Sequence, residues 1–129
     1  MTSQKKILGT SLERTVVQKA QKRGLRAARQ PLSGALKSAP NDVVIESDTE
    51  RALIECKVRA VKVDARGKRI ISFDLEWLNK VTTNAAAFGF DFGAVIFRPK
   101  GSPKQYAVLD ADELLELAER KPRKSRKVS

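Results

Sequence analysis

The stretch that most constrains the fold runs from residue 40 to residue 57 and has the pattern of a β-hairpin. Two apolar runs, at 43–45 and 53–54, flank a Ser-Asp-Thr-Glu segment that is typical of a turn. If the turn is centred in this segment, residues that face each other have position numbers that sum to 97, so Asp42 lies opposite Glu55. The sequence therefore predicts two antiparallel strands in one register.

The two facing carboxylates need a positive charge between them. Directly opposed residues have Cβ atoms about 4.5–5.5 Å apart, and like charges at this separation destabilise a sheet. A divalent metal ion would supply the missing charge. Because side chains alternate between the faces of a strand, Glu55 and Lys57 point the same way and Cys56 points the other way. An Asp, a Glu and a Lys are therefore expected to converge on one spot.

Length and composition indicate one domain of ordinary size. The chain has 129 residues, 32% of them charged and 41% hydrophobic. We expect residues 1–120 to form a single domain and residues 121–129 a basic, disordered tail. No run approaches the roughly 18 apolar residues of a membrane span, and no apolar segment typical of a secretory signal is visible. We therefore expect no membrane partner and a cytoplasmic location, in a host cell if the protein is viral, without secretion.

The absence of histidine and the single cysteine exclude several chemistries. Ser-His-Asp and Cys-His triads, zinc sites built on imidazole and an internal disulfide are not available to this chain. Acid–base or metal chemistry must use carboxylates and lysine. Cys56 is most simply a small buried hydrophobe, with a redox role as the alternative.

The net charge of +11 is concentrated at the two ends of the chain. Residues 1–39 hold nine Lys and Arg against one acid, residues 120–129 hold six against none, and residues 40–119 hold eleven against fourteen acids. Basic ends around a slightly acidic centre suit a polyanion held over a metal-binding floor, and nucleic acid is the obvious polyanion. The alternative is that a basic chain is merely soluble.

The rest of the chain predicts a mixed sheet flanked by helices. Trp77 is expected to pack in the core, and the leucines of the last helix, at 114, 115 and 117, are expected to point inward. The predicted elements, in order, are a helix from Ser11 to Gly24, a strand over 25–29, the hairpin, a strand over 70–73, a helix capped by Asp74 or Ser72 and ending at Gly89, strands over 92–97 and 106–109, and a helix from Asp110 or Asp112 to Arg120.

Glu13 is the only acid of the basic N-terminal region, and it falls inside the apolar stripe of the first helix. Burying an unpaired carboxylate costs several kcal/mol by rough estimate. Glu13 therefore needs a partner such as a metal ion, its water or an arginine. The structural alternative is that Glu13 pairs with Arg14 or another neighbour at the edge of the stripe.

The loop over 30–40 is rich in Pro, Gly and Ser and leads directly into Asp42. Ser33 and Gly34 could present a hydroxyl and backbone N–H groups to a phosphate, with Arg29 and Lys37 beside them. Most Ser-Gly pairs are only turns, so this pattern is weak by itself.

Together these features resemble the PD-(D/E)XK nuclease superfamily, and most closely its archaeal-type Holliday junction resolvases, which also occur in viruses. The resemblance covers residues from Leu8 to about Phe97. Asn41 precedes Asp42, so the Pro-Asp pair of the family pattern is not literal here. The residues that carry the resemblance are Glu13 on the first helix, Arg29 ahead of the Ser33-Gly34 loop, Asp42 at the start of a strand, and Glu55-Cys56-Lys57 on the next strand.

The resemblance implies an α/β fold with a restriction-endonuclease-like core, a working homodimer and phosphodiester hydrolysis in branched DNA. Asp42 and Glu55 would bind Mg²⁺, with Mn²⁺ as an alternative, together with the backbone carbonyl of Cys56. Glu13 would complete the cluster directly or through water, and Lys57 would activate the attacking water. Ser33, also expected among the catalytic residues, would hold the scissile phosphate or the strand next to it together with Arg29. The expected DNA-binding residues are Arg14, Arg29, Ser33, Gly34, Lys37 and Arg59.

Three functional hypotheses follow, led by a Mg²⁺-dependent endonuclease that resolves four-way junctions by paired cuts. The second is another DNA nuclease on the same scaffold, such as a nickase, a flap or repair enzyme, or a restriction-type enzyme. The third is a non-catalytic nucleic-acid-binding protein in which Asp42, Glu55 and Lys57 form a structural ion-pair cluster.

Overall fold

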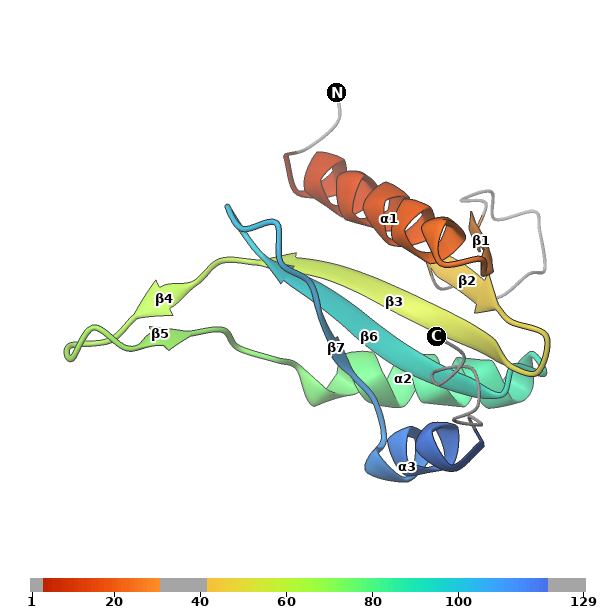
Figure 1. The fold of residues 1–129 in the computed structure, drawn as a ribbon. Helices are drawn as coiled ribbons and strands as arrows, with labels where there is room; N and C mark the ends of the chain where they lie inside the picture. The colour runs from red at the N-terminus through yellow and green to blue at the C-terminus, as the bar shows by residue number, and fades with distance from the viewer. Residues whose placement is uncertain (1–3, 31–41, 121–129) are drawn as a thin grey trace, which may run out of the picture.

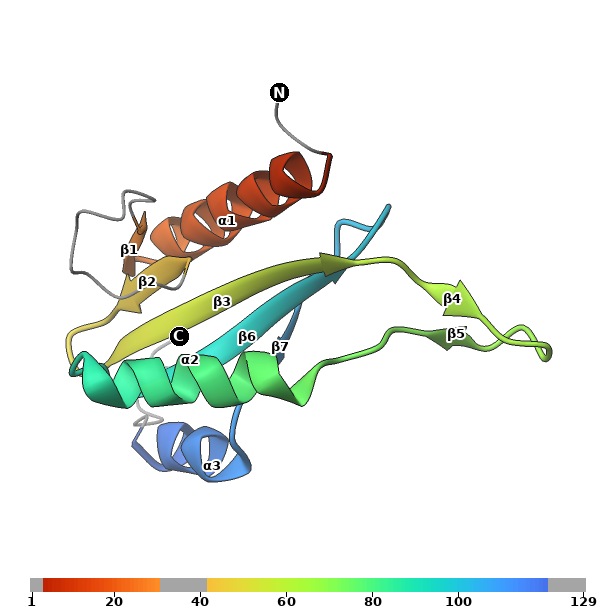
Figure 2. The ribbon, with the colours of Figure 1, turned by 180° about the vertical axis from the view of Figure 1, so that it is seen from behind.

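The computed structural model describes residues 4–30 and 42–120, which form a five-stranded mixed sheet with a long helix on each face (Figures 1 and 2). The elements are α1 (Gln4–Lys22), β1 (Arg26–Arg29), β2 (Val43–Glu46), β3 (Arg51–Arg59), β4 (Lys62–Val63), β5 (Arg69–Ile70), α2 (Leu75–Ala87), β6 (Phe92–Pro99), β7 (Tyr106–Val108) and α3 (Ala111–Arg120). The sheet order is β1-β2-β3-β6-β7. Only β3 and β6 are parallel, because α2 carries the chain across one face of the sheet between them. The predicted mixed sheet flanked by helices is confirmed.

The register predicted for the β2–β3 hairpin is confirmed. Val43 pairs with Ile54 and Val44 pairs with Leu53, so facing positions sum to 97. Ser47 closes the turn because its hydroxyl accepts hydrogen bonds from the backbone N–H groups of Thr49 (3.2 Å) and Glu50 (3.0 Å). The turn chemistry therefore determines which residues stand opposite each other at the open end of the hairpin.

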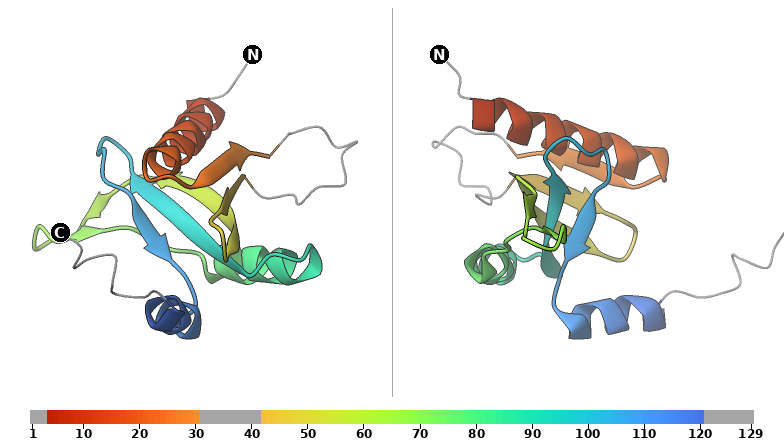
Figure 3. Two further views of the ribbon diagram at one scale, coloured as in Figure 1. Left: turned by 45° about the vertical axis from the view of Figure 1, so that its right-hand side comes forward. Right: turned by 90° about the vertical axis from the view of Figure 1, so that its left-hand side faces the viewer.

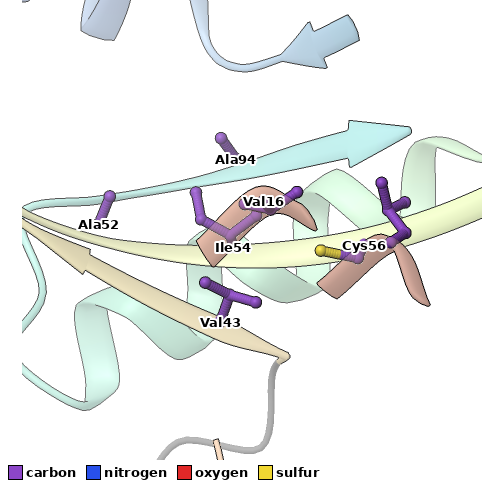
Figure 4. Packing of buried hydrophobic residues seen from close by; sticks show 7 residues of the cluster. Val16, Val43, Ala52, Ile54, Cys56 and Ala94 are labelled. Atoms are coloured by element: carbon purple, nitrogen blue, oxygen red, sulfur yellow. The ribbon is translucent and has the colours of Figure 1, made fainter. Parts of the chain in front are cut away.

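The alternation along β3 produces two cores, one on each face of the sheet. Gly93 is required on the α2 side, because a Cβ atom at this position would lie 2.6 Å from the carbonyl oxygen of Val81 in α2. The core on the α1 side, shown in Figure 4, contains Leu12, Val16, Val43, Ala52, Ile54, Cys56 and Ala94. The core on the α2 side contains Leu53, Val81, Ala85 and Val95.

Two predicted boundaries differ from the structure. The first helix begins at Gln4 rather than Ser11, and it ends at Lys22, shortly before Gly24, whose φ of 83° is the left-handed conformation that stops a helix. The predicted strand over 70–73 is wrong. Only Arg69 and Ile70 form a strand there, and it pairs with β4 in a separate two-stranded sheet that extends away from the body (Figures 1 and 2).

The inward orientation predicted for the leucines of the last helix is wrong for two of them. Leu114 is 55% exposed and Leu115 is 60% exposed, whereas Leu117 is half-buried. Figure 3 shows α3 as a separate rod below the sheet, beyond the end of β7. The leucine spacing correctly predicted a helix with an apolar face, but it did not predict that much of this face is exposed to solvent.

The predicted tail over 121–129 and the loop with Ser33, Gly34 and Lys37 lie outside the described residues. Within the described part of the chain, no helix is long and apolar enough to cross a membrane.

Candidate active site

The open end of the β2–β3 hairpin lies beside a cavity of about 450 Å³ between the sheet and α2. Asp42, Glu55 and Lys57 line this cavity from the sheet. The structure therefore brings together the three residues that the register predicted. The other lining residues come from α2 and the residue before it: Asp74, Glu76, Trp77, Lys80 and Asn84.

Asp42 is held in place by the neighbouring strand. Its backbone N–H donates to the carbonyl oxygen of Ile54 (3.1 Å), and its Oδ2 accepts a hydrogen bond from the backbone N–H of Cys56 (2.8 Å). The pKa of Asp42 is raised to about 7, chiefly by burial. The Cys56 N–H lowers this pKa, whereas the charges of Glu55 and Glu13 and a hydrogen bond with the Glu13 side chain raise it. Near neutral pH, Asp42 is therefore protonated for part of the time.

Glu13 has an arginine as its partner. Its side chain is only 13% exposed, and its Oε1 accepts a hydrogen bond from Nε of Arg29 at 3.0 Å. This ion pair joins α1 to β1, and a side-chain hydrogen bond joins Glu13 to Asp42. The prediction that Glu13 needs a partner is confirmed, and the partner is Arg29, whereas Arg14 is exposed on α1.

Glu55 and Lys57 lie on the same face of β3, as predicted, and form an ion pair of 3.2 Å. The Lys57 ammonium also lies 5.2 Å from the centre of the Trp77 ring, and the Arg59 guanidinium lies 4.5 Å from it. The side chain of Lys57 is 25% exposed, so its charge is held near the cavity by an acid on one side and an aromatic face on the other. Cys56 points into the opposite core, where burial raises the pKa of its thiol well above the usual range.

The α2 side of the cavity was missed by the reading of the sequence. Trp77 packs against the α2-side core, as expected, but it is only half-buried, and its ring also lies beside Lys57 and Arg59 of β3. Trp77, Lys80 and Asn84 are spaced three and four residues apart, which places them on one helix face. This face borders the buried stripe of Val81 and Ala85. The spacing could have predicted that these three side chains share one helix face, but it does not show which cavity this face borders. Asp74 caps α2 as predicted, because its side chain accepts a hydrogen bond from the backbone N–H of Glu76.

The cluster suits a hard divalent cation. Across residues 4–30 and 42–120, no three Asp, Glu or Cys side chains are close enough to ligate one ion by themselves. The predicted ligand set needs only the carboxylates of Asp42 and Glu55, because its third ligand is the backbone carbonyl of Cys56. Burial is the main cause of the raised pKa of Asp42, and the charges of Glu55 and Glu13 raise it further, so these neighbours add an excess of negative charge here. A cation would relieve this excess, and an all-oxygen ligand set suits Mg²⁺.

The predicted DNA-binding residues have different surroundings. Arg29 forms an ion pair with Glu13, Arg59 stacks on Trp77 at the cavity, and Arg14 is exposed on α1. Ser33, Gly34 and Lys37 lie outside the described residues. The described part of the site therefore has a carboxylate floor and a cationic rim made by Lys57, Arg59 and Lys80.

Comparison with known proteins gives a family match and a similar solved structure. Residues 4–120 match the model of the family described as archaeal Holliday junction resolvase, Hjc. A solved structure of Hjc from Archaeoglobus fulgidus, described as a Holliday junction resolvase from an archaeal hyperthermophile, is 20% identical to this chain. The similarity covers 83% of this chain and 93% of that chain, with a TM-score of 0.49. No curated protein matches the sequence. The match to the family model covers most of the chain and therefore shows the family by itself.

Proposed function

The chain belongs to the archaeal Holliday junction resolvase family and is an endodeoxyribonuclease that resolves Holliday junctions, and we propose that Asp42, Glu55 and Lys57 perform its chemistry. The observation that supports this assignment is the convergence of the three side chains on one cavity, at the open end of a hairpin whose register is set by its turn. The restriction-endonuclease-like core expected for this family agrees with the mixed sheet and its two flanking helices.

Members of this family are metal-dependent nucleases, and the metal proposed here is Mg²⁺, with Mn²⁺ as the alternative. Asp42, Glu55 and the backbone carbonyl of Cys56 would hold the ion, with Glu13 next to it. An ion bound there would supply Lewis-acid stabilisation of the charge that develops on the scissile phosphate. Asp42 would then be ionised, because a cation favours the carboxylate over the carboxylic acid.

Lys57 is the proposed group that orients the attacking water. Its ammonium pairs with Glu55 at 3.2 Å. If Glu55 ligates a cation, this pair would weaken and Lys57 would be available to hydrogen-bond the water and a phosphate oxygen. Trp77 limits the directions that the ammonium can take, because it lies 5.2 Å away on the other side.

Branched DNA is the substrate of the family, and the remaining predictions concern how this chain holds it. Arg14, Arg29 and Arg59 are proposed to contact the DNA backbone near the cut, together with Ser33, Gly34 and Lys37 of the loop over 30–40. Arg59 is the best placed of the described residues, because it stacks on Trp77 at the cavity. Arg29 would act mainly through Glu13, to which it is bound.

A homodimer is the proposed working form. Resolution of a four-way junction requires two cuts on strands of like polarity, and a two-fold dimer would place one site at each strand. The domain limits of 1–120, the tail over 121–129 and a cytoplasmic location stay predictions. Sedimentation of the full chain at micromolar concentration measures the oligomeric state, and a monomer that still makes paired cuts at the same rate would contradict the proposal.

The test of the active site is cleavage of a labelled four-way junction in Mg²⁺. The wild-type protein is expected to leave symmetric nicked duplexes, and Glu55→Gln is expected to bind the junction without cutting it. The matched control is Asp48→Asn, because Asp48 lies on the turn of the same hairpin and its side chain is 99% exposed. Full cutting by Glu55→Gln would rule out this site.

The same assay separates junction resolution from other activities of this scaffold. Flap, nicked and linear substrates are incubated beside the junction at equal enzyme concentration. A junction resolvase cuts the junction much faster than the linear duplex, whereas equal rates on all four would indicate a general nuclease. Binding without cutting in either Mg²⁺ or Mn²⁺ would indicate a non-catalytic protein.

A further inference from the structure

A short two-stranded arm, residues 61–71, extends beyond the active-site strand and belongs to neither core. Figures 1 and 2 show it projecting from the end of β3 away from the sheet and both long helices. Its strands, β4 and β5, pair only with each other, and every residue from Lys62 to Ile70 is exposed. A segment of this kind contributes little to the stability of the domain, so its composition reflects another role.

The arm is strongly cationic because its one acid is used internally. Residues 61–71 contain four cations, Lys62, Arg66, Lys68 and Arg69, against Asp64 alone. The Oδ1 of Asp64 accepts hydrogen bonds from the backbone N–H groups of Arg66 and Lys68, both at 2.9 Å. Asp64 therefore builds the turn, and the cationic side chains around the turn remain directed at solvent.

The arm begins directly after the strand that carries the active-site residues. β3 carries Glu55 and Lys57 and ends at Arg59, only three residues before β4 begins. The Arg59 side chain stacks on Trp77 at the cavity, and its carbonyl oxygen accepts a hydrogen bond from the backbone N–H of Lys100 at 2.8 Å. The arm is thus an extension of the strand that carries the proposed catalytic lysine.

The reach of the arm corresponds to about one turn of duplex DNA. Arg66, at the turn, lies nine positions after Lys57, and an extended strand rises about 3.3 Å per residue. The turn therefore lies up to about 30 Å from the catalytic lysine, compared with about 34 Å for one helical turn of B-DNA.

From these observations we propose that the arm over 61–71 is a DNA grip, which binds the phosphate backbone of a junction's duplex arm up to about one helical turn from the cut. This inference rests on the proposed function of the cavity. A second copy of the chain is the competing occupant, and the pairing of the arm disfavours it. Val63 faces Arg69 and Ile70 faces Lys62 across the ladder, so each face carries one apolar residue and one cation, and neither is an apolar docking face.

The test compares two variants of the full chain that lose the same number of cations. The arm variant carries Arg66→Gln, Lys68→Gln and Arg69→Gln. The control variant carries Lys19→Gln, Lys22→Gln and Arg23→Gln, at exposed positions at the end of α1. Binding is measured by fluorescence anisotropy in EDTA over a range of salt concentrations, on junctions with duplex arms of about 20 base pairs and of about 6 base pairs, the latter being only about 20 Å long.

The arm variant is expected to bind the long-armed junction about 10- to 100-fold more weakly at physiological salt, with a salt slope smaller by about 2 to 3. On the short-armed junction its loss is expected to be below about threefold, because the wild-type arm finds few phosphates there. The control variant loses the same factor on both. An equal loss by the arm variant on both junctions, or a loss no larger than that of the control, would overturn the grip.

Two further readouts separate the remaining outcomes. A smaller sedimentation mass for the arm variant than for the wild type would overturn the grip in favour of contact between two copies. Cutting in Mg²⁺ at saturating enzyme is expected to be retained by both variants. If the wild-type protein cuts no junction, the proposed function of the cavity fails independently of the arm.

Discussion

Replacing Asp42 by Asn is expected to stabilise the metal-free protein while abolishing its activity. The pKa of Asp42 is raised from 3.8 to about 7, so the folded state disfavours the charged carboxylate. A difference of about three pKa units corresponds to about 4 kcal/mol at most. Solvent screening of a side chain that is only half-buried reduces this, and we expect a gain of about 2 kcal/mol.

Asparagine preserves the two contacts of Asp42. Its carbonyl oxygen still accepts the hydrogen bond from the Cys56 N–H, which is 2.8 Å long in the wild type. Its NH₂ group can donate to the Glu13 side chain, with which Asp42 forms a hydrogen bond in the wild type. The substitution therefore removes the charge without leaving a buried group unsatisfied.

The stabilisation expected from Asp42→Asn should depend on pH. The folded-state pKa of Asp42 lies above its unfolded value, so the wild-type protein loses stability as the pH rises from about 4 to about 7. The gain from Asp42→Asn should be largest above pH 7, smaller at pH 5 and absent below about pH 4. Mg²⁺ should stabilise the wild type and not the variant, because only the wild type offers the carboxylate.

The assay is urea unfolding in EDTA and in Mg²⁺, followed by the fluorescence of the single tryptophan, Trp77, which lines the cavity. Asp48→Asn is the control and should change stability by less than about 0.5 kcal/mol, because this carboxylate is exposed. A loss of stability in Asp42→Asn, or a gain that does not change between pH 5 and pH 8, would refute the claim that the carboxylates repel each other.

Three further substitutions test other parts of the site. Arg29→Met leaves the 13% exposed Glu13 without its cation and should lower the free energy of unfolding by about 2 kcal/mol; urea unfolding should show this loss disappearing in a Glu13→Leu background. Gly93→Ala places a Cβ atom 2.6 Å from the Val81 carbonyl oxygen and should cost about 1–3 kcal/mol, measured by thermal unfolding, and an unchanged midpoint would contradict the close approach of α2. Trp77→Leu removes the aromatic face beside the β3 cations and should slow junction cutting about fivefold, equivalent to about 1 kcal/mol, and an unchanged rate in single-turnover assays would show that Trp77 is only a core residue.

The sheet part of the site was predictable because it depends on local chemistry. The turn at Ser47 sets the register, the register sets which residue faces which, and strand alternation separates Glu55 and Lys57 from Cys56. These steps need no knowledge of distant contacts. The need of Glu13 for a partner also followed from its position in the apolar stripe, although Arg29 could not be chosen over Arg14 without the placement of α1 on β1.

The errors concern what helices and short strands meet in three dimensions. The leucines at 114 and 115 form an apolar face, but no pattern shows that α3 lies at the edge of the body with this face exposed. The apolar residues near position 70 predicted a strand of the main sheet, but the sheet continues through β6 and the strand there pairs with β4 alone. In both cases the local sequence correctly predicted the type of element, but the part of the molecule that the element contacts was predicted wrongly.

The three carboxylates of the site are compensated in three different ways. Arg29 forms an ion pair with Glu13, Lys57 forms an ion pair with Glu55, and the raised pKa of Asp42 leaves this carboxyl group partly protonated near neutral pH. A divalent cation held by Asp42 and Glu55, as proposed, would compete with the last two, because it would favour the ionised form of Asp42 and weaken the attraction of Glu55 for Lys57. The Arg29–Glu13 pair would remain, so α1 would stay fixed to the sheet. Metal binding at this site would therefore release a proton from Asp42 and also make Lys57 available.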